Sequence, residues 1–142
     1  MKKLQLLFLS SFLLTSCFTK NHRFSSATIS ELVANEGGHS YSNLNFCLTD
    51  EIGYSTYNVD IIIITLDNQT FDGQVNLYGC NETSKKCFEF RTTDFLTRIQ
   101  FSKPEEYKKV AQIYKENIKS ITLKIHEQYY DEIIDSIEVT SF

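Results

Sequence analysis

Glycine and proline are scarce in this chain, and their scarcity excludes several kinds of protein. There are five glycines and one proline among 142 residues. The glycines form no phosphate-binding loop, and the chain has neither a Gly-x-Ser-x-Gly nucleophile elbow nor a His-Glu-x-x-His zinc motif. A lone proline, with no internal repeat and no low-complexity tract, indicates one domain rather than two joined by a hinge.

Positive charge is also in short supply. The chain has 14 Lys and Arg residues against 18 Asp and Glu residues, which gives a net charge of −4. An acidic protein is repelled by phosphate backbones and by anionic lipid. The sequence therefore predicts no nucleic-acid partner, and no set of residues in it indicates a cofactor.

Long apolar runs are missing except for one near the start of the chain. Eleven residues from Leu4 to Leu14 follow Lys2 and Lys3. A bilayer core needs about 20 apolar residues to be spanned by a helix, so this run is typical of an export signal rather than a permanent membrane helix. It closes on Leu14-Thr15-Ser16-Cys17, where small residues precede a cysteine.

This arrangement resembles the signal peptide of bacterial lipoproteins. The resemblance implies cleavage between Ser16 and Cys17, a diacylglycerol group on the Cys17 sulfur, and a membrane held as a partner through lipid. Phe18 stands where an aspartate would indicate retention in the inner membrane, so the resemblance favours the outer membrane, facing the periplasm. The alternatives are an ordinary secretory signal with an incidental cysteine and a buried N-terminal helix.

The resulting organisation is a signal peptide at 1–16, a lipidated cysteine and polar tether at 17–27, and one globular domain at 28–142. Cleavage leaves 142 − 16 = 126 residues, and the loss of Lys2 and Lys3 changes the net charge from −4 to −6. A chain of this length buries roughly two-thirds of its unfolded surface, which is enough for a core.

Three cysteines remain once Cys17 carries lipid, so only one disulfide can form in an oxidising compartment. Cys80 and Cys87 flank a polar, turn-forming stretch between two strand-like runs. We expect these two sulfurs to meet across a hairpin neck and to form the bridge. A bond from Cys47 to either of them is the alternative.

Alternating apolar and polar residues predict a mainly β domain. The run from Ile61 to Ile64 is apolar on both faces and indicates a central strand. A capping-box pattern at Thr28 to Glu31 predicts one or two helical turns, and a second at Ser102 to Glu105 begins a longer helix that reaches Ile118. The predicted strands cover 44–48, 57–66, 71–77, 86–91, 95–101, 121–125 and 137–139.

Six or seven short strands with one inserted amphipathic helix predict an antiparallel β-sandwich. The alternative is an α+β roll, in which the helix covers one face of a single sheet. The chain lacks alternating strand and helix units, which argues against a doubly wound nucleotide-binding fold.

Candidate catalytic residues are few, and we assign none. His39 lies in a glycine-rich joint, His22 in the predicted tether, and His126 at a strand end, where histidines are usually surface residues. The loop from Asp67 to Gly73 carries oxygen ligands that calcium could use, but Asp and Asn are also the preferred residues of hairpin turns. We interpret the loop as a turn and predict no metal site.

Tyrosine is the remaining surplus, with eight residues. Tyr129 and Tyr130 lie beside Asp131 and Glu132 near a predicted strand end, and tyrosines with neighbouring carboxylates suit the recognition of a basic protein surface. Their alternative role is packing at the edge of the core. The sequence thus predicts a non-enzymatic binding domain for another envelope protein or a toxin, acting in assembly, adhesion or toxin immunity. A small periplasmic hydrolase or ligand carrier is the alternative.

Overall fold

The structure is a computed structural model that describes residues 22–34, 40–53, 55–79, 85–96 and 104–142. Its strands are β1 Phe24–Ile29, β2 Val33–Ala34, β3 Ser40–Tyr41, β4 Asn43–Leu48, β5 Thr56–Thr65, β6 Thr70–Tyr78, β7 Cys87–Arg91, β8 Ile118–Glu127 and β9 Ile133–Val139. Two short helices, α1 Thr92–Phe95 and α2 Pro104–Val110, and a 3-10 turn, Lys115–Asn117, complete the described elements.

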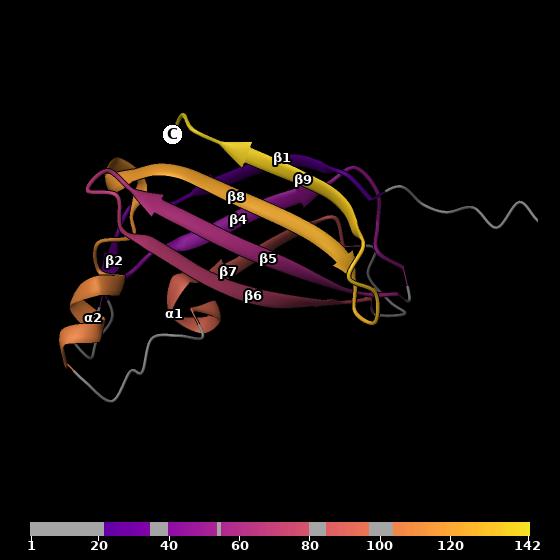
Figure 1. Cartoon of the computed structure of the whole chain (residues 1–142), viewed down its shortest axis with the longest axis horizontal. Helices are drawn as coiled ribbons and strands as arrows, with labels where there is room; N and C mark the ends of the chain where they lie inside the picture. Colours follow the sequence, from indigo (N-terminus) through magenta and orange to yellow (C-terminus); the bar gives the residue numbers. More distant parts are fainter. Residues whose placement is uncertain (1–21, 35–39, 54, 80–84, 97–103) are drawn as a thin grey trace, which may run out of the picture.

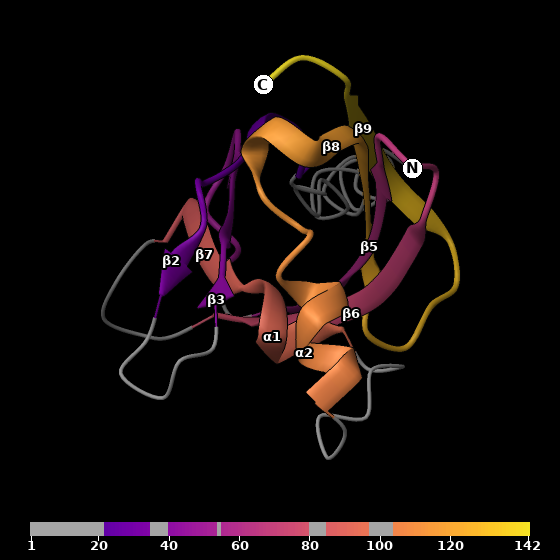
Figure 2. The same ribbon diagram turned by 90° about the vertical axis from the view of Figure 1, so that its left-hand side faces the viewer.

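Two antiparallel sheets form a sandwich-like domain, so the predicted mainly β fold is confirmed. The larger sheet has the strand order β6-β5-β8-β9, and the smaller has the order β1-β4-β7; β2 and β3 pair separately. At one side β1 lies along β9, as Figure 1 shows, and the Phe24 N–H donates to Asp135 Oδ2 at 2.7 Å there. At the other side α1 lies between β6 and β7 (Figure 2). Both helices lie toward one end of the sandwich, which we call the helix end (Figure 1).

The central position of β5 is confirmed, because it pairs with β6 on one side and β8 on the other. Its side chains alternate between a buried face, with Ile61 and Ile63, and a partly exposed face, with Ile62 and Ile64. The run is apolar on both faces in sequence, but only one of its faces is buried. One face packs in the sandwich and the other remains in contact with solvent, as is usual for an antiparallel sheet.

The core lies between the inward faces of the two sheets. In the smaller sheet, Phe46 on β4 is almost fully buried, and its ring centroid lies 5.6 Å from that of Phe88 on β7. The larger sheet contributes alternate β-branched residues of β5 and β8, which pack well on a pleated surface. The fully buried aliphatic side chains of these two strands are Val59, Ile61, Ile63, Ile121, Leu123 and Ile125.

The long amphipathic helix predicted to reach Ile118 is wrong in its second half. α2 ends at Val110, where the Ile113 N–H donates to the Val110 carbonyl in a tighter turn. Ile118 instead begins β8 and pairs with Thr65. The segment from Ile118 onward also alternates with period two. Pairing with β5 makes its backbone hydrogen bonds and places its apolar face in the core.

The predicted strand at 95–101 is wrong at its first residue, because Phe95 is the last residue of α1. Residues 97–101 lie outside the described part. Phe95 is fully buried against β6. This contact requires glycine on β6, because a Cβ at Gly73 would lie 1.9 Å from the Phe95 carbonyl oxygen. The backbone of α1 therefore approaches the sheet more closely than any side chain would allow.

The N-terminal predictions also need correction. The segment Thr28–Glu31 is not helical, because Thr28 and Ile29 complete β1, which pairs with β4. The tether was expected to reach Ala27, but β1 begins at Phe24 and His22 is buried, so residues 22–27 belong to the folded domain. Pairing with β4 satisfies the backbone N–H and C=O groups of this polar segment, which shows little apolar periodicity of its own.

The disulfide joins Cys47 to Cys87, so the predicted pairing of Cys87 with Cys80 is wrong. Cys47 on β4 lies directly opposite Cys87 on β7 in the antiparallel register, and the bond closes a sequence separation of 40 residues. Residue 80 lies outside the described residues. The bridge depends on the pairing of two strands that are distant in sequence, and a local turn pattern carries no information about that pairing.

Candidate partner-binding site

The connection between β8 and β9 places the four predicted binding residues at one end of the sandwich. Tyr129 and Tyr130 expose 86% and 65% of their surface. The Tyr130 N–H donates to the Glu127 carbonyl at 3.1 Å, which turns the chain at the end of β8. Asp131 and Glu132 follow, before β9 begins, and both are exposed. The structure therefore brings all four predicted residues together on the surface, rather than packing the tyrosines against the core.

Three further apolar residues extend this surface and were not predicted. Ile133 and Ile134 begin β9 and are both exposed. Tyr78 ends β6, with 60% of its surface exposed, and pairs with Thr56, whose carbonyl accepts a hydrogen bond from the Gln128 N–H. We call the combined surface the tyrosine patch; its members are Tyr78, Tyr129, Tyr130, Asp131, Glu132, Ile133 and Ile134.

The sequence did carry a signal for these missed residues. Tyr78 follows Leu77 in the outward phase of the alternation that also places Gln74 and Asn76 outside. Ile133 and Ile134 are adjacent, so a strand with one buried face cannot bury both. What the sequence lacks is the strand order, which brings the end of β6 to the same end of the sheet as the β8–β9 connection.

His126 holds the hairpin that carries the patch. Its Nδ1 lies 3.1 Å from the Tyr130 carbonyl oxygen, and its Nε2 lies 3.4 Å from Asp60 Oδ2 on β5. Asp60 in turn accepts a hydrogen bond of 2.7 Å from Gln74 Nε2 on β6. This chain of polar contacts ties the end of β8 to the two neighbouring strands.

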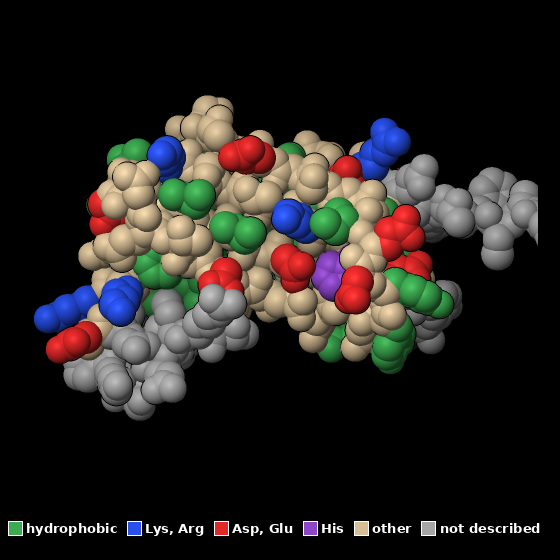
Figure 3. All heavy atoms as spheres, in the orientation of Figure 1, with side chains coloured by type: hydrophobic (Ala, Val, Ile, Leu, Met, Phe, Trp, Pro, Cys, Tyr) green, Lys and Arg blue, Asp and Glu red, His purple; other side chains and the backbone are tan. Residues whose placement is uncertain are grey.

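Figure 3 views the outer face of the larger sheet, where acidic, basic and histidine side chains lie close together. Both nitrogens of the His126 ring face oxygen atoms of its own fold. His126 therefore acts as a positioning contact for the hairpin.

No family model, no curated protein sequence and no solved structure matches this chain.

His22, which was expected to lie in the tether, has a structural place in the fold. Tyr57 is buried, and its ring packs edge-on against the ring of His22, with centroids 4.7 Å apart. This contact covers the end of the core where the described chain begins. Cys17, His39 and Tyr54 lie outside the described residues.

The loop that offered oxygen ligands forms a hairpin turn. The Thr65 hydroxyl donates to one oxygen of the Asp67 carboxylate, and Gln69 Nε2 donates to the other at 2.6 Å. These contacts, led by the Thr65 hydroxyl, hold the pKa of Asp67 below its ordinary value. Asn68 adopts a positive φ of 62°, which the turn requires and Asn tolerates. Asp72 lies on β6, beyond the turn.

Within the described ranges, no group of three or more His, Cys, Asp or Glu side chains could hold a metal ion. Among the same residues, the structure contains no helix of the length and apolar character needed to cross a bilayer.

Proposed function

We propose that this chain is a membrane-anchored lipoprotein of the bacterial envelope, whose β-rich domain binds another protein through the tyrosine patch. The function is non-enzymatic and belongs to assembly, adhesion or the neutralisation of a toxin. The observation that carries the proposal is the exposure of Tyr129, Tyr130, Ile133 and Ile134 around two carboxylates. Exposed apolar side chains gathered at one place are typical of protein-binding surfaces.

The chemistry of the patch supports a basic partner. Tyrosines supply contact area with little loss of side-chain entropy, and their hydroxyls tolerate water at the rim. Asp131 and Glu132 are exposed, so their charges act mainly on the rate of association and are weakened by salt. The tyrosines and isoleucines would govern dissociation, because their contacts are short-ranged.

The proposed anchor supports action at a membrane. The run that ends at Cys17 supports lipidation, and Phe18 after it favours the outer membrane, with the domain in the periplasm. Each buried CH₂ contributes about 0.8 kcal/mol, and stable anchoring needs about two acyl chains, which a diacylglycerol supplies. Metabolic labelling with fatty acid tests this part, since Cys17→Ser should lose the label and remain folded.

The binding patch is tested by capture from envelope extract. One variant carries Tyr129→Ser, Tyr130→Ser, Asp131→Asn and Glu132→Gln. A matched control carries the same kinds of change on exposed residues at the helix end, namely Leu32→Ser, Leu66→Ser, Glu105→Gln and Glu116→Gln.

We expect the patch variant to lose partner capture about tenfold or more, as substitution of central aromatic contacts does elsewhere, while the control retains it. Both variants should keep the melting temperature of the wild type to within a few degrees, because exposed substitutions change stability little. Equal capture by the two variants would place the binding surface elsewhere.

A further inference from the structure

The outer strand β6 leaves one edge of the larger sheet without a paired strand among the described residues. The Gly79 N–H donates to the Ser55 carbonyl at 3.3 Å, so the odd-numbered residues of β6 are those that exchange hydrogen bonds with β5. In an antiparallel ladder, the residues between them direct their N–H and C=O groups to the other side. The backbone groups of Gln74, Asn76 and Tyr78 therefore point away from β5, and no described residue forms a hydrogen bond with them.

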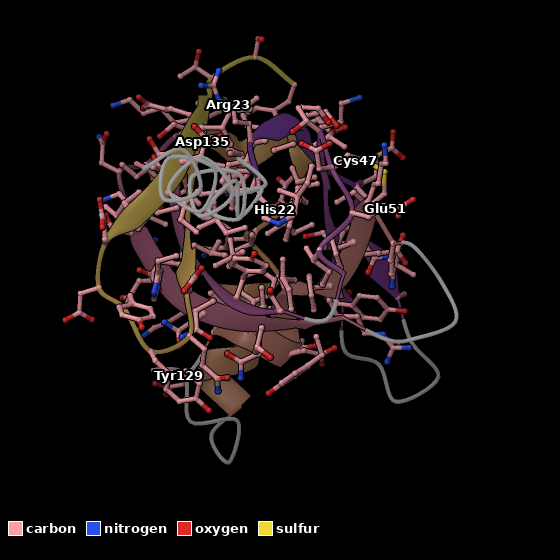
Figure 4. All side chains as sticks on the ribbon, turned by 90° about the vertical axis from the view of Figure 1, so that its right-hand side faces the viewer. His22, Arg23, Cys47, Glu51, Tyr129 and Asp135 are labelled. Carbon is pink, nitrogen blue, oxygen red and sulfur yellow. A yellow bond between two sulfur atoms is a disulfide. The ribbon has the colours of Figure 1, made fainter. Side chains whose placement is uncertain are left out.

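The other edges of the two main sheets carry features that hinder pairing with a further strand. β9 lies along β1, where Asp135 accepts the hydrogen bond from the Phe24 N–H; Figure 4 shows Asp135 beside Arg23 at this side. β1 also has a shift in its register with β4. β7 has only five residues, and Glu89 and Arg91 on it are exposed. Covering segments, bulges, short strands and charges are the usual means by which proteins keep sheet edges from pairing.

β6 and the residue after it show none of these features over the stretch from Gly73 to Gly79, as far as the structure describes its surroundings. The register with β5 runs without a shift along the whole strand. The stretch reads Gly-Gln-Val-Asn-Leu-Tyr-Gly and contains neither a charge nor a proline. α1 approaches β6 only at Gly73, at one end of the stretch. A regular, uncharged edge of this kind is suited to pairing with another strand.

The stretch is complementary to a second copy of itself. A two-fold axis at Asn76 places Gln74 opposite Tyr78 of the second copy on the exposed face of the sheet. The same axis places Val75 opposite Leu77 of the second copy on the buried face, and glycine opposite glycine at both ends. The free N–H and C=O groups of the two copies then face each other. No like charges meet across the pair, which would otherwise oppose its formation.

We propose that this chain forms a two-fold dimer in which β6 pairs antiparallel with β6 of a second copy. The pairing joins two four-stranded sheets into one continuous sheet, and two-fold dimers are the commonest protein oligomers. The stretch has no charge that would select a different chain, whereas its own sequence supplies a matching residue at every position. The dimer goes beyond the proposed function and rests neither on the lipid anchor nor on the binding role of the tyrosine patch.

Disulfide cross-linking of the full chain in the expressing cells tests the register. Two tagged copies are co-expressed, one with Gln74→Cys and the other with Tyr78→Cys, both in a Cys80→Ser background. In the proposed register the two Cα atoms lie about 5.5 Å apart, which a disulfide spans, whereas each variant paired with itself is about 13 Å out of register. After addition of an oxidant, we expect the mixed pair to give covalent dimers in about fivefold greater yield than either variant alone. Equal yields in all combinations, or no dimers, would overturn the pairing.

A pair of proline variants tests whether the edge of β6 carries the dimer. Asn76→Pro removes an N–H that points away from β5, so it blocks the second copy and spares the β5–β6 ladder. Thr70→Pro is the matched control, because Thr70 is also an exposed, even-numbered residue of β6 but lies outside the paired stretch. In sedimentation velocity, we expect Asn76→Pro to weaken dimerisation about tenfold or more, and Thr70→Pro to leave it within about twofold. Equal dimerisation of the two would contradict the proposal. Asn76→Lys, which places two like charges on the axis, replaces the proline variant if that variant does not fold.

Amide hydrogen exchange separates a second copy from other coverings of this edge. The N–H groups of Gln74, Asn76 and Tyr78 should exchange more slowly as the fraction of dimer rises, because pairing removes them from water. Slow exchange in a sample that sediments as a monomer would show that a segment of the same chain covers the edge. Fast exchange at every concentration would show that the edge stays open, and either result overturns the dimer. The binding role of the tyrosine patch can survive each result, because the variant at residues 129–132 tests it separately.

Discussion

The two ends of this sandwich present similar kinds of side chain to opposite environments. At the helix end, Phe95, Val110 and Ile113 are completely buried. At the patch end, Tyr129 and Tyr130 are largely exposed, and Ile133 beside them exposes half of its surface. Both sets include residues of the connections between strands, so residue type alone does not separate them.

The difference shows which apolar residues the fold needs. The helix end closes the gap between β6 and β7, and its side chains complete the core. At the patch end, β1 already lies along β9 and His22 already covers Tyr57, so the core is closed without the hairpin residues. Apolar side chains that the core does not use are available to bind a partner.

Removal of Phe95 should give the largest effect and most clearly separate the two ends. Phe95→Ala empties a fully buried site, and such substitutions destabilise proteins by about 3–5 kcal/mol. Tyr129→Ala, the matched change at the exposed end, should alter the free energy of unfolding by less than about 0.5 kcal/mol. Urea unfolding measures both. Comparable losses would mean that the hairpin also belongs to the core.

Removal of the disulfide should give the second-largest loss of stability. Cys47 and Cys87 lie at the ends of β4 and β7 and close a separation of 40 residues. Cys47→Ala with Cys87→Ala should cost about 2–4 kcal/mol of unfolding free energy by loss of the loop constraint. Non-reducing peptide mapping identifies the bond first. A bridge that contains Cys80 would contradict the register of β4 with β7.

His126→Ala should have a smaller effect on stability and a clear effect on binding. The substitution removes the contacts to the Tyr130 carbonyl and to Asp60, and a lost hydrogen bond of this kind costs about 1 kcal/mol. Capture of the partner should weaken because the hairpin is held less firmly. Lys124→Ala, on the same strand, is the control and should leave capture unchanged. Full capture by His126→Ala would show that the hairpin needs no support.

The smallest effect should come from Asp67→Asn, in the turn at the helix end. The hydrogen bond from Thr65 lowers the native pKa of Asp67 below its ordinary value of 3.8. The carboxylate therefore stabilises the fold above the ordinary pKa, and this contribution is lost as the pH falls through the native pKa. Thermal unfolding should show a small deficit for the variant near pH 7 that disappears in acid. A deficit that persists at low pH would assign it to the altered turn geometry.

The sequence predicted those features that depend on local periodicity. The alternation in β4, β5, β6, β7 and β8 identified these strands, and the pair of tyrosines beside two acids identified the centre of the patch. Features that depend on distant pairing were missed. β1 was assigned to a tether because the segment has little apolar pattern of its own. Its backbone hydrogen bonds are made by pairing with β4, which is distant in sequence.

The other misses have the same origin. The disulfide followed the β4–β7 register rather than the nearest turn, and Tyr78 joined the patch only because β5 connects β6 to β8. The end of the predicted helix fits both the helical spacing and the alternation of a strand. The segment from Ile118 forms a strand because it pairs with β5, and no local pattern contains the information about that pairing.

Chemical modification of tyrosines tests most directly the claim that the tyrosine patch binds a partner. The protein in intact envelope and the purified Cys17→Ser domain are iodinated under the same conditions, and the modified peptides are quantified. We predict that Tyr129 and Tyr130 react readily in the purified domain and are protected in the envelope, whereas acetylation of the exposed Lys109 at the helix end is equal in both. Equal iodination of Tyr129 and Tyr130 in the two preparations would contradict the account.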